Sequence, residues 1–173
     1  MAFNFQFRHA EERKEIDQLA KFLLFQPLGY PNYEDWVERA RVELLSGDKS
    51  SILAFSDGVL VGDALYQPHK QFPRVREIKN MRVHPKLQGR YFGVFMLKQA
   101  EAENPEDYDA IITDIRFDNT PVLHMARFCG YDELVRTQLY ERNAQEVVMV
   151  KKFSRTPFGF FGPIRKSLVS HSY

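Results

Sequence analysis

The sequence predicts one α/β domain, in which helices flank a sheet, and three observations support this fold class. The chain has 173 residues, of which 44% are hydrophobic, so it is long enough for a single domain with a sizeable core. Apolar residues recur at helical spacing in some segments and alternate in others. The expected elements follow one another as β, α, α, then three strands, then α, β, α, β, β.

The N-terminal half is expected to contain a strand, two helices and a hairpin. Phenylalanines alternate along residues 3–7 as in a strand, and apolar stripes at helical spacing predict helices over residues 9–25 and 33–44. Prolines and a glycine interrupt the pattern between these helices. Residues 51–55 and 59–66 are expected to be strands joined by a Ser-Asp-Gly turn.

The C-terminal half continues with alternating strands and helices. Residues 75–83 carry apolar residues and no glycine, which predicts a strand that ends before Pro85. A helix is expected to open within residues 88–93 and to run to about residue 104. The remaining expected elements are a strand at 109–115, a short helix at 119–129 that Asn119 can cap, and a hairpin of strands 134–140 and 146–152.

The strand at residues 75–83 does not alternate strictly. Ile78, Met81 and Val83 are the expected inward residues, and the first differs in parity from the other two. A β-bulge near Lys79 and Asn80 would restore the alternation. Such a bulge would also splay this strand from its neighbour and open a slot beside it.

The strand, turn and helix over residues 75–93 carry the clearest functional signal. A helix that begins after a glycine-containing turn presents free backbone N–H groups and the positive end of its dipole. This arrangement predicts a site for a phosphate or pyrophosphate group. The alternative is that Gln88 and Gly89 form a plain turn.

Two segments of the chain resemble motifs of the GNAT acetyltransferase superfamily. Residues 83–93 resemble its acyl-CoA-binding motif, which is Gln or Arg, two residues, Gly, one residue, then Gly or Ala. Gln88 and Gly93 match the ends of that motif. Residues 119–131 resemble the closing motif, which starts with Asn and ends in Gly-Phe or Gly-Tyr. The expected element order is also that of the GNAT fold.

The resemblance implies a GNAT fold over residues 1–153, with a mixed, mostly antiparallel sheet that has a central splayed strand pair. It also implies an N-acetyltransferase that moves an acetyl group from acetyl-CoA, or another acyl-CoA, to an unidentified small-molecule or macromolecular amine. Glu77 would be the general base, directly or through water. Its alternative role is to neutralise Lys79 and Arg76. The implied cofactor-binding residues are Met81, Arg82, Val83, Gln88, Gly89, Arg90, Tyr91, Phe92, Gly93 and Asn119.

Two departures from the family pattern leave a second reading open. Tyr91 stands where the motif has its middle glycine, and a tyrosine adopts positive φ only at a cost. The loop is therefore expected to keep a negative φ at this position or to hold CoA differently. Ala126 stands where many relatives have a tyrosine that protonates the leaving thiolate. The alternative function is a catalytically impaired CoA-binding or regulatory module.

Composition and charge narrow the remaining possibilities. The single cysteine, Cys129, excludes a disulfide framework, so a reducing, cytoplasmic location is expected. The histidines show no metal-ligand spacing, so no metal is expected, and no apolar run is long enough to span a membrane. Seven Lys and Arg residues lie between Lys70 and Arg90. They suit a solvated strand face, attraction of CoA, or an RNA-borne amine.

Residues 154–173 lie beyond the family resemblance and form an aromatic and basic C-terminal arm. Its prolines and glycines are expected to exclude a simple helix. The arm is expected to pack on its own domain or on a second subunit, which makes a homodimer one possible partner arrangement. A hook for a partner protein or a membrane surface is the alternative.

Overall fold

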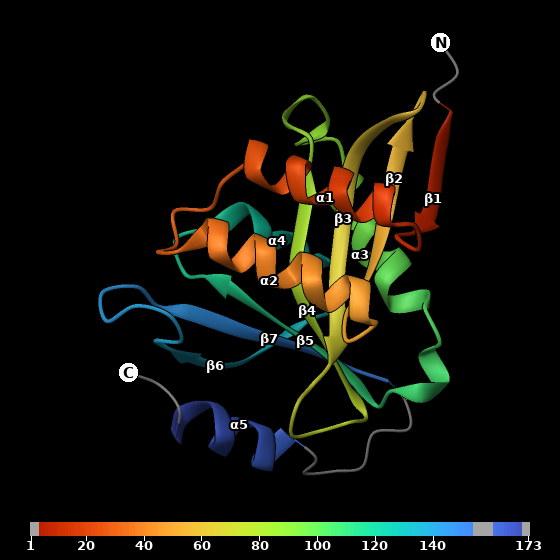
Figure 1. Cartoon of the computed structure of the whole chain (residues 1–173). Coiled ribbons are helices and arrows are strands. Elements are labelled where there is room, and N and C mark those ends of the chain that lie inside the picture. Colours follow the sequence, from red (N-terminus) through yellow and green to blue (C-terminus); the bar gives the residue numbers. More distant parts are fainter. Residues whose placement is uncertain (1–3, 154–160, 171–173) are drawn as a thin grey trace. The chain divides into compact units, whose positions relative to one another are not determined.

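The computed structural model describes residues 4–153 and 161–170 (Figure 1). These residues form two compact units. Unit 1 contains the described residues up to Gln67 and the segment Asn80–Ala100, and unit 2 contains Pro68–Lys79 and the described residues from Glu101 onward. The strand β4 (Val75–Val83) passes from one unit into the other.

Unit 1 is built from an antiparallel sheet and the helices that cover it. β1 pairs with β2 and β2 pairs with β3, both in antiparallel register. The elements are β1 (Phe5–His9), α1 (Arg13–Phe25), α2 (Tyr33–Ser46), β2 (Ser50–Ser56), β3 (Val59–Pro68), the C-terminal part of β4, the short 3-10 helix η1 (Pro85–Leu87), and α3 (Phe92–Ala102).

The core of unit 1 follows from the spacing of apolar residues in α1 and α2, which lie side by side (Figure 1). Residues three or four apart share one helix face, and those faces are buried against the strands. The buried side chains include Ile16, Leu19 and Leu23 of α1, Val37, Ala40 and Leu44 of α2, and Leu53, Phe55 and Leu65 of the sheet.

Unit 2 has a mixed sheet. β4 pairs with β5 in parallel register from Val75↔Ala110 to Ile78↔Thr113, whereas β5 pairs with β7, and β6 with β7, in antiparallel register. Its elements are the first part of β4, η2 (Pro105–Asp107), β5 (Ala110–Arg116), α4 (Thr120–Phe128), β6 (Asp132–Thr137), β7 (Glu146–Lys152) and α5 (Phe161–Ser170). Along the whole sheet the strand order is β1-β2-β3-β4-β5-β7-β6.

The predicted fold class is confirmed, because the sheet is mixed, mostly antiparallel and flanked by helices. The strand predicted at residues 75–83 has those bounds in the structure. Of its expected inward residues, Ile78 is buried, whereas Met81 and Val83 are half-buried. The expected bulge near Lys79 and Asn80 stays a prediction. These two residues lie at the boundary between the two units in the sequence.

The C-terminal arm contains a helix, so the expectation that proline and glycine exclude one is wrong for residues 161–170. Pro163 is the third residue of α5, where its missing N–H would have had no partner within the helix. Ile164 of α5 is fully buried in a cluster with Val75 and Ala110 of the unit-2 sheet. The other residues of the predicted arm, 154–160 and 171–173, lie outside the described residues.

None of the helices formed by the described residues is both long and apolar enough to cross a membrane.

Candidate active site

The predicted cofactor residues of β4 lie at the end of the strand in unit 1. Met81, Arg82 and Val83 are all half-buried. After them the chain is held to β3 by a hydrogen bond of 2.8 Å from the His84 amide to the Val61 carbonyl oxygen. The side chain of Gln88 donates to the carbonyl oxygen of Val83 at 3.0 Å, so this residue of the family motif fastens the turn to the strand.

The turn that follows has two residues in left-handed backbone conformation. Gly89 has φ of 71° and Tyr91 has φ of 60°. The first alternative given for Tyr91, a negative φ, is therefore wrong. This conformation costs a non-glycine residue about 1–2 kcal/mol, and the Tyr91 side chain is 73% exposed. The chain thus keeps the backbone shape that the motif's glycine would adopt, with a large side chain added.

The loop is anchored to unit 1 through the first residue of α3. Phe92 is buried, and its ring centroid lies 5.1 Å from that of Phe5. A Cβ atom placed on Gly62 of β3 would lie 3.1 Å from the Phe92 ring and 3.2 Å from the Arg82 carbonyl oxygen. Glycine at position 62 therefore allows β3, β4 and the start of α3 to approach closely. The other loop residues, Gln88, Gly89, Arg90 and Tyr91, are exposed.

Asn119, the predicted cofactor residue of the closing motif, lies at the start of α4 in unit 2. Its backbone carbonyl oxygen accepts a hydrogen bond of 3.1 Å from the Leu123 amide. Its exposed side chain makes no capping hydrogen bond to the described residues of the helix, although the sequence predicted that it could. Ala126 is buried in the same helix, so the position that often carries a phenol in relatives is a packing position here.

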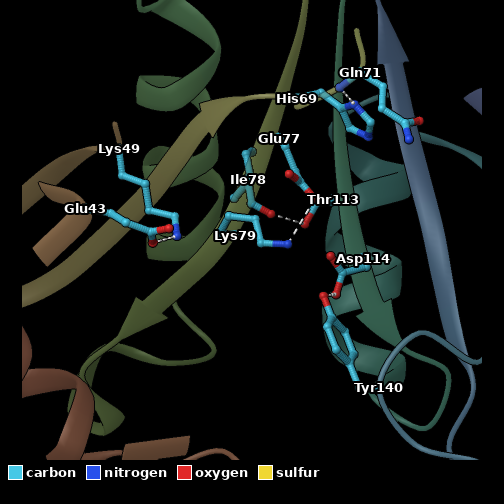
Figure 2. A network of polar contacts seen from close by, with 10 residues as sticks. All are labelled: Glu43, Lys49, His69, Gln71, Glu77, Ile78, Lys79, Thr113, Asp114 and Tyr140. Carbon is cyan, nitrogen blue, oxygen red and sulfur yellow. Dashed lines mark hydrogen bonds and ion pairs between the residues drawn. The ribbon is translucent and has the colours of Figure 1, made fainter. Parts of the chain in front are cut away.

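Glu77, the predicted general base, lies on the unit-2 part of β4 and forms an ion pair with Lys79 (Figure 2). The Glu77 carboxylate oxygen and the Lys79 ammonium nitrogen are 3.0 Å apart, and the two side chains are 18% and 19% exposed. Residues two apart in a strand lie on one face, which explains the contact. Both roles predicted for Glu77 are thus compatible with its position, because it is partly exposed and it also neutralises a lysine.

Two polar residues that the sequence analysis missed lie on the same unit. Asp114 of β5 accepts a hydrogen bond of 2.9 Å from the Tyr140 hydroxyl group (Figure 2). Removal of the Asp114 carboxyl from water raises its pKa, and the positive charge of Lys79 partly opposes this. Asp114 could have been noticed as the one charged residue in a mostly apolar strand segment, Ala110-Ile111-Ile112-Thr113-Asp114-Ile115.

Unit 1 contains a second polar cluster that was also missed. Asp63 of β3 is fully buried and accepts a hydrogen bond of 2.8 Å from the side-chain amide of Asn80 in β4. Burial raises the pKa of Asp63 to about 7, while the Asn80 hydrogen bond and the charge of Arg82 act in the opposite direction. Burial also raises the pKa of Tyr33, which lies in the same cluster.

The basic run from Lys70 to Arg90 does not form one solvated cationic face. Arg74 forms an ion pair with Asp109 at 2.8 Å. Arg76 is only 2% exposed, with its guanidinium carbon 4.2 Å above the Tyr108 ring. Lys79 is paired with Glu77, as described above. The exposed basic residues of the run other than Arg74 are Lys70, Lys86 and Arg90.

Over residues 4–153 and 161–170, no group of three or more His, Cys, Asp or Glu residues is arranged to hold a metal ion.

Comparison with known proteins gives a family match and a fold match. The family model of the acetyltransferase (GNAT) family matches residues 11–131. That span contains the predicted base and all the predicted cofactor residues. A search of curated proteins found no match.

Solved structures of low sequence identity share the fold. A protein from Desulfovibrio desulfuricans that is assigned to the GNAT acetyltransferases matches with a TM-score of 0.76 and 13% identity, over 86% of this chain and 99% of that one. The ribosomal-protein-S18-alanine N-acetyltransferase from Escherichia coli matches with a TM-score of 0.72 and 13% identity, over 90% and 98%.

A third structure, an acetyltransferase-like protein from Salmonella typhimurium with its cofactor acetyl-CoA, matches with a TM-score of 0.67 and 13% identity, over 89% of this chain and 98% of that one. The likeness to these structures concerns the fold, whereas the family model spans more than half of the chain. The chain belongs to the GNAT acetyltransferase family.

Proposed function

We propose that the protein transfers an acetyl group from acetyl-CoA to an amine by direct attack of the amine on the thioester. The observation that supports this most strongly is the turn from Gln88 to Gly93. It keeps left-handed backbone at Gly89 and Tyr91 and leads directly into α3. Backbone N–H groups at the start of a helix are suited to a pyrophosphate, which acetyl-CoA carries.

The cofactor would be held by backbone groups more than by charged side chains. Met81, Arg82 and Val83 end an extended strand, so their backbone groups are suited to pair with the pantetheine arm as another strand would. A backbone N–H of this segment would polarise the thioester carbonyl. Lys86 and Arg90 are exposed beside the turn and would add attraction for the phosphates. Asn119 would contact the pantetheine arm or its surroundings.

In the transfer itself, the amine nitrogen forms a bond to the acetyl carbon while the carbon–sulfur bond breaks. The amine must lose a proton to attack, and Glu77 would accept it, directly or through a water molecule. The ion pair with Lys79 places a positive charge beside the Glu77 carboxylate. The thiolate that leaves must gain a proton, and because Ala126 cannot supply one, we assign that role to solvent water.

A GNAT-fold module that binds CoA but no longer turns over is the second candidate. The buried Ala126 and the strained Tyr91 are the observations that favour it. The two candidates share cofactor binding and differ in chemistry. Measurements of binding and of turnover therefore separate them.

Thermal unfolding with and without acetyl-CoA and CoA tests the shared step. A ligand at about 100 times its Kd adds roughly 2.7 kcal/mol to the unfolding free energy. An upward shift in Tm establishes cofactor binding, whereas the absence of a shift at millimolar ligand removes both candidates.

Substitution of Glu77 tests the chemical step. Loss of a general base costs about 10²–10⁴-fold in rate, so we expect Glu77→Gln to lose kcat by that order while keeping the Tm shift with acetyl-CoA. Asp132→Asn, at an exposed position of β6, is the matched control and should leave kcat unchanged. Equal kcat in Glu77→Gln and wild type would remove Glu77 from the mechanism, and no turnover by wild type with any amine would favour the binding module.

A further inference from the structure

The exposed side chain of Tyr91 distinguishes the turn before α3 from the family motif. The motif has glycine at this position, and glycine adopts a left-handed conformation without strain. Tyr91 holds that conformation with φ of 60°, although its Cβ atom makes it unfavourable. The side chain is 73% exposed, so the ring adds little buried area to the core of unit 1. The shape of the turn therefore does not require this ring, and burial in the core does not explain it.

A second exposed aromatic side chain, Phe95, lies one helical turn after Tyr91. The Phe95 amide donates to the Tyr91 carbonyl oxygen at 3.3 Å, and the Val94 amide donates to the same oxygen at 3.0 Å. Residues four apart lie on the same side of a helix. Phe95 is 58% exposed, whereas Phe92 and Met96 beside it are buried. The start of α3 thus presents two aromatic rings to solvent.

Positive charge surrounds the two rings in the sequence. Residues 84–98, which include both rings, contain Lys86, Arg90 and Lys98 and no Asp or Glu. All three of these basic residues are exposed. A surface of this composition attracts anions such as phosphate groups. The turn and the start of α3 therefore combine exposed aromatic rings with positive charge in one short segment of unit 1.

This combination fits a phosphorylated nucleotide better than it fits an apolar surface of another protein. A nucleotide base has a flat π surface that stacks on aromatic side chains, and phosphate groups pair with lysine and arginine. An apolar protein surface would cover the rings but would offer no complement to the positive charge. CoA carries an adenine base beside a 3′-phosphate and a pyrophosphate, so one ligand supplies both parts.

We propose that Tyr91 and Phe95 form an aromatic platform on which the adenine ring of acetyl-CoA stacks, with Lys86 and Arg90 attracting its phosphate groups. This inference rests on the proposed function and adds a choice of acetyl donor to it. A donor must carry the nucleotide to make this contact. The same acetyl group on the phosphopantetheine arm of a carrier protein, which has no adenosine, would bind more weakly.

A series of three ligands tests the platform without any transfer assay. The probes are CoA, dephospho-CoA, which lacks only the 3′-phosphate, and 4′-phosphopantetheine, which lacks the adenine nucleotide. Their Kd values are measured by calorimetric titration. We expect 4′-phosphopantetheine to bind the wild-type protein at least about tenfold more weakly than dephospho-CoA, as for loss of one stacked base. Equal Kd values for these two ligands would overturn the proposal.

Tyr91→Gly removes the ring and restores the residue of the family motif. Glycine adopts the left-handed conformation, so the variant should fold with an unchanged or raised Tm. We expect its Kd for CoA and for dephospho-CoA to rise about tenfold and its Kd for 4′-phosphopantetheine to change by less than about twofold. Equal losses for all three ligands would show that Tyr91 acts through the shape of the turn, which would also overturn the proposal.

Three further variants test the platform as a pair of rings. Tyr91→Phe keeps the ring and should retain the tighter binding of dephospho-CoA over 4′-phosphopantetheine. Phe95→Leu keeps an apolar side chain in α3 without a π surface, so it should lose part of that preference. Val42→Ala, which shortens an exposed apolar side chain of α2, is the control. Full loss of the preference in Tyr91→Phe, or its full retention in both Tyr91→Gly and Phe95→Leu, would contradict stacking.

The binding and transfer assays fail independently. Binding of CoA that depends on Tyr91, in a protein that acetylates no amine, would sustain the platform and remove the proposed transfer. Acetylation with the same KM for acetyl-CoA in the wild type and Tyr91→Gly would sustain the transfer and remove the platform. Titration with adenosine 3′,5′-bisphosphate covers the remaining case. Absence of binding of this nucleotide and of CoA would remove the platform, whatever the transfer assays show.

Discussion

Unit 1 and unit 2 each contain a strand aspartate that accepts a side-chain hydrogen bond and has a raised pKa, but the two sites differ in their access to water. Asp63 in unit 1 is fully buried and is bound by the amide of Asn80, which is itself buried. Asp114 in unit 2 is half-buried and is bound by the phenol of Tyr140, which is 41% exposed. Solvent therefore reaches the second arrangement and not the first. The same residue type therefore serves the core in one unit and a surface site in the other.

The largest expected effect concerns Asp63 and pH. Its pKa is 3.8 as a free side chain and about 7 in the folded protein. As pH rises from 3.8, the unfolded chain ionises first, so the unfolding free energy falls and levels off above pH 7. A rise of about three units corresponds to roughly 4 kcal/mol.

Asp63→Asn removes this titration and keeps an oxygen that can accept from Asn80. We expect the stability of the variant to depend less on pH between 5 and 8 than that of wild type, as measured by urea unfolding at several pH values. Asn80 and Arg82, which oppose the effect of burial on the pKa of Asp63, are unchanged in this variant. Parallel stability curves for the two proteins would show that Asp63 is ionised in the fold at neutral pH.

An intermediate effect is expected for Asn80→Ala. It removes the donor to Asp63 and leaves a buried carboxyl oxygen without a partner, which costs about 1–3 kcal/mol. Because the charged form loses more stabilisation than the neutral form, we expect the loss to be larger at pH 8 than at pH 5, again by urea unfolding. The double variant Asp63→Asn with Asn80→Ala is the control, and its loss should hardly depend on pH.

The smallest effect is expected for Tyr140→Phe, the corresponding change in unit 2. Water can replace the phenol at a half-buried carboxyl group, so we expect a loss of about 0.5–1.5 kcal/mol or less. Chemical denaturation at pH 7 measures it beside Asn80→Ala. If Tyr140→Phe cost more than Asn80→Ala, the contrast between a core site and a surface site would not hold.

The sequence predicted the fold well because periodicity and turn residues determine each element locally. The bounds of β4 and the burial of the apolar stripes in α1 and α2 agree with that reasoning. The sequence-based prediction failed for α5. Pro163 lies in the first turn of this helix, and Ile164 is buried in a cluster that the local sequence pattern does not predict. Tertiary packing therefore determines the structure of residues 161–170.

The candidate site was predicted only in part. The turn around Gln88 could be recognised because the spacing of a motif is a local property. The pairing of Glu77 with Lys79 follows from strand geometry and was named as one of two roles. Asp114 was missed, since its partner Tyr140 is 26 positions away in the chain and meets it only in the folded protein. Asp63 was missed for the same reason, because its partner Asn80 lies on another strand.

The exposed turn beside α3 has a consequence for how the folded protein is cut by proteases. Lys86 and Arg90 lie on either side of Gly89 in exposed positions, and Tyr91 follows with most of its side chain in water. Of the basic side chains of β4, Arg76 is buried and Lys79 forms an ion pair with Glu77. Strands also resist cleavage, because their backbone is hydrogen-bonded to neighbouring strands. Brief digestion should therefore nick this turn early, with trypsin after Arg90 and chymotrypsin after Tyr91. A bound pyrophosphate that engages the same backbone would shield those bonds, so the fragment pattern would report cofactor occupancy without any assay of transfer.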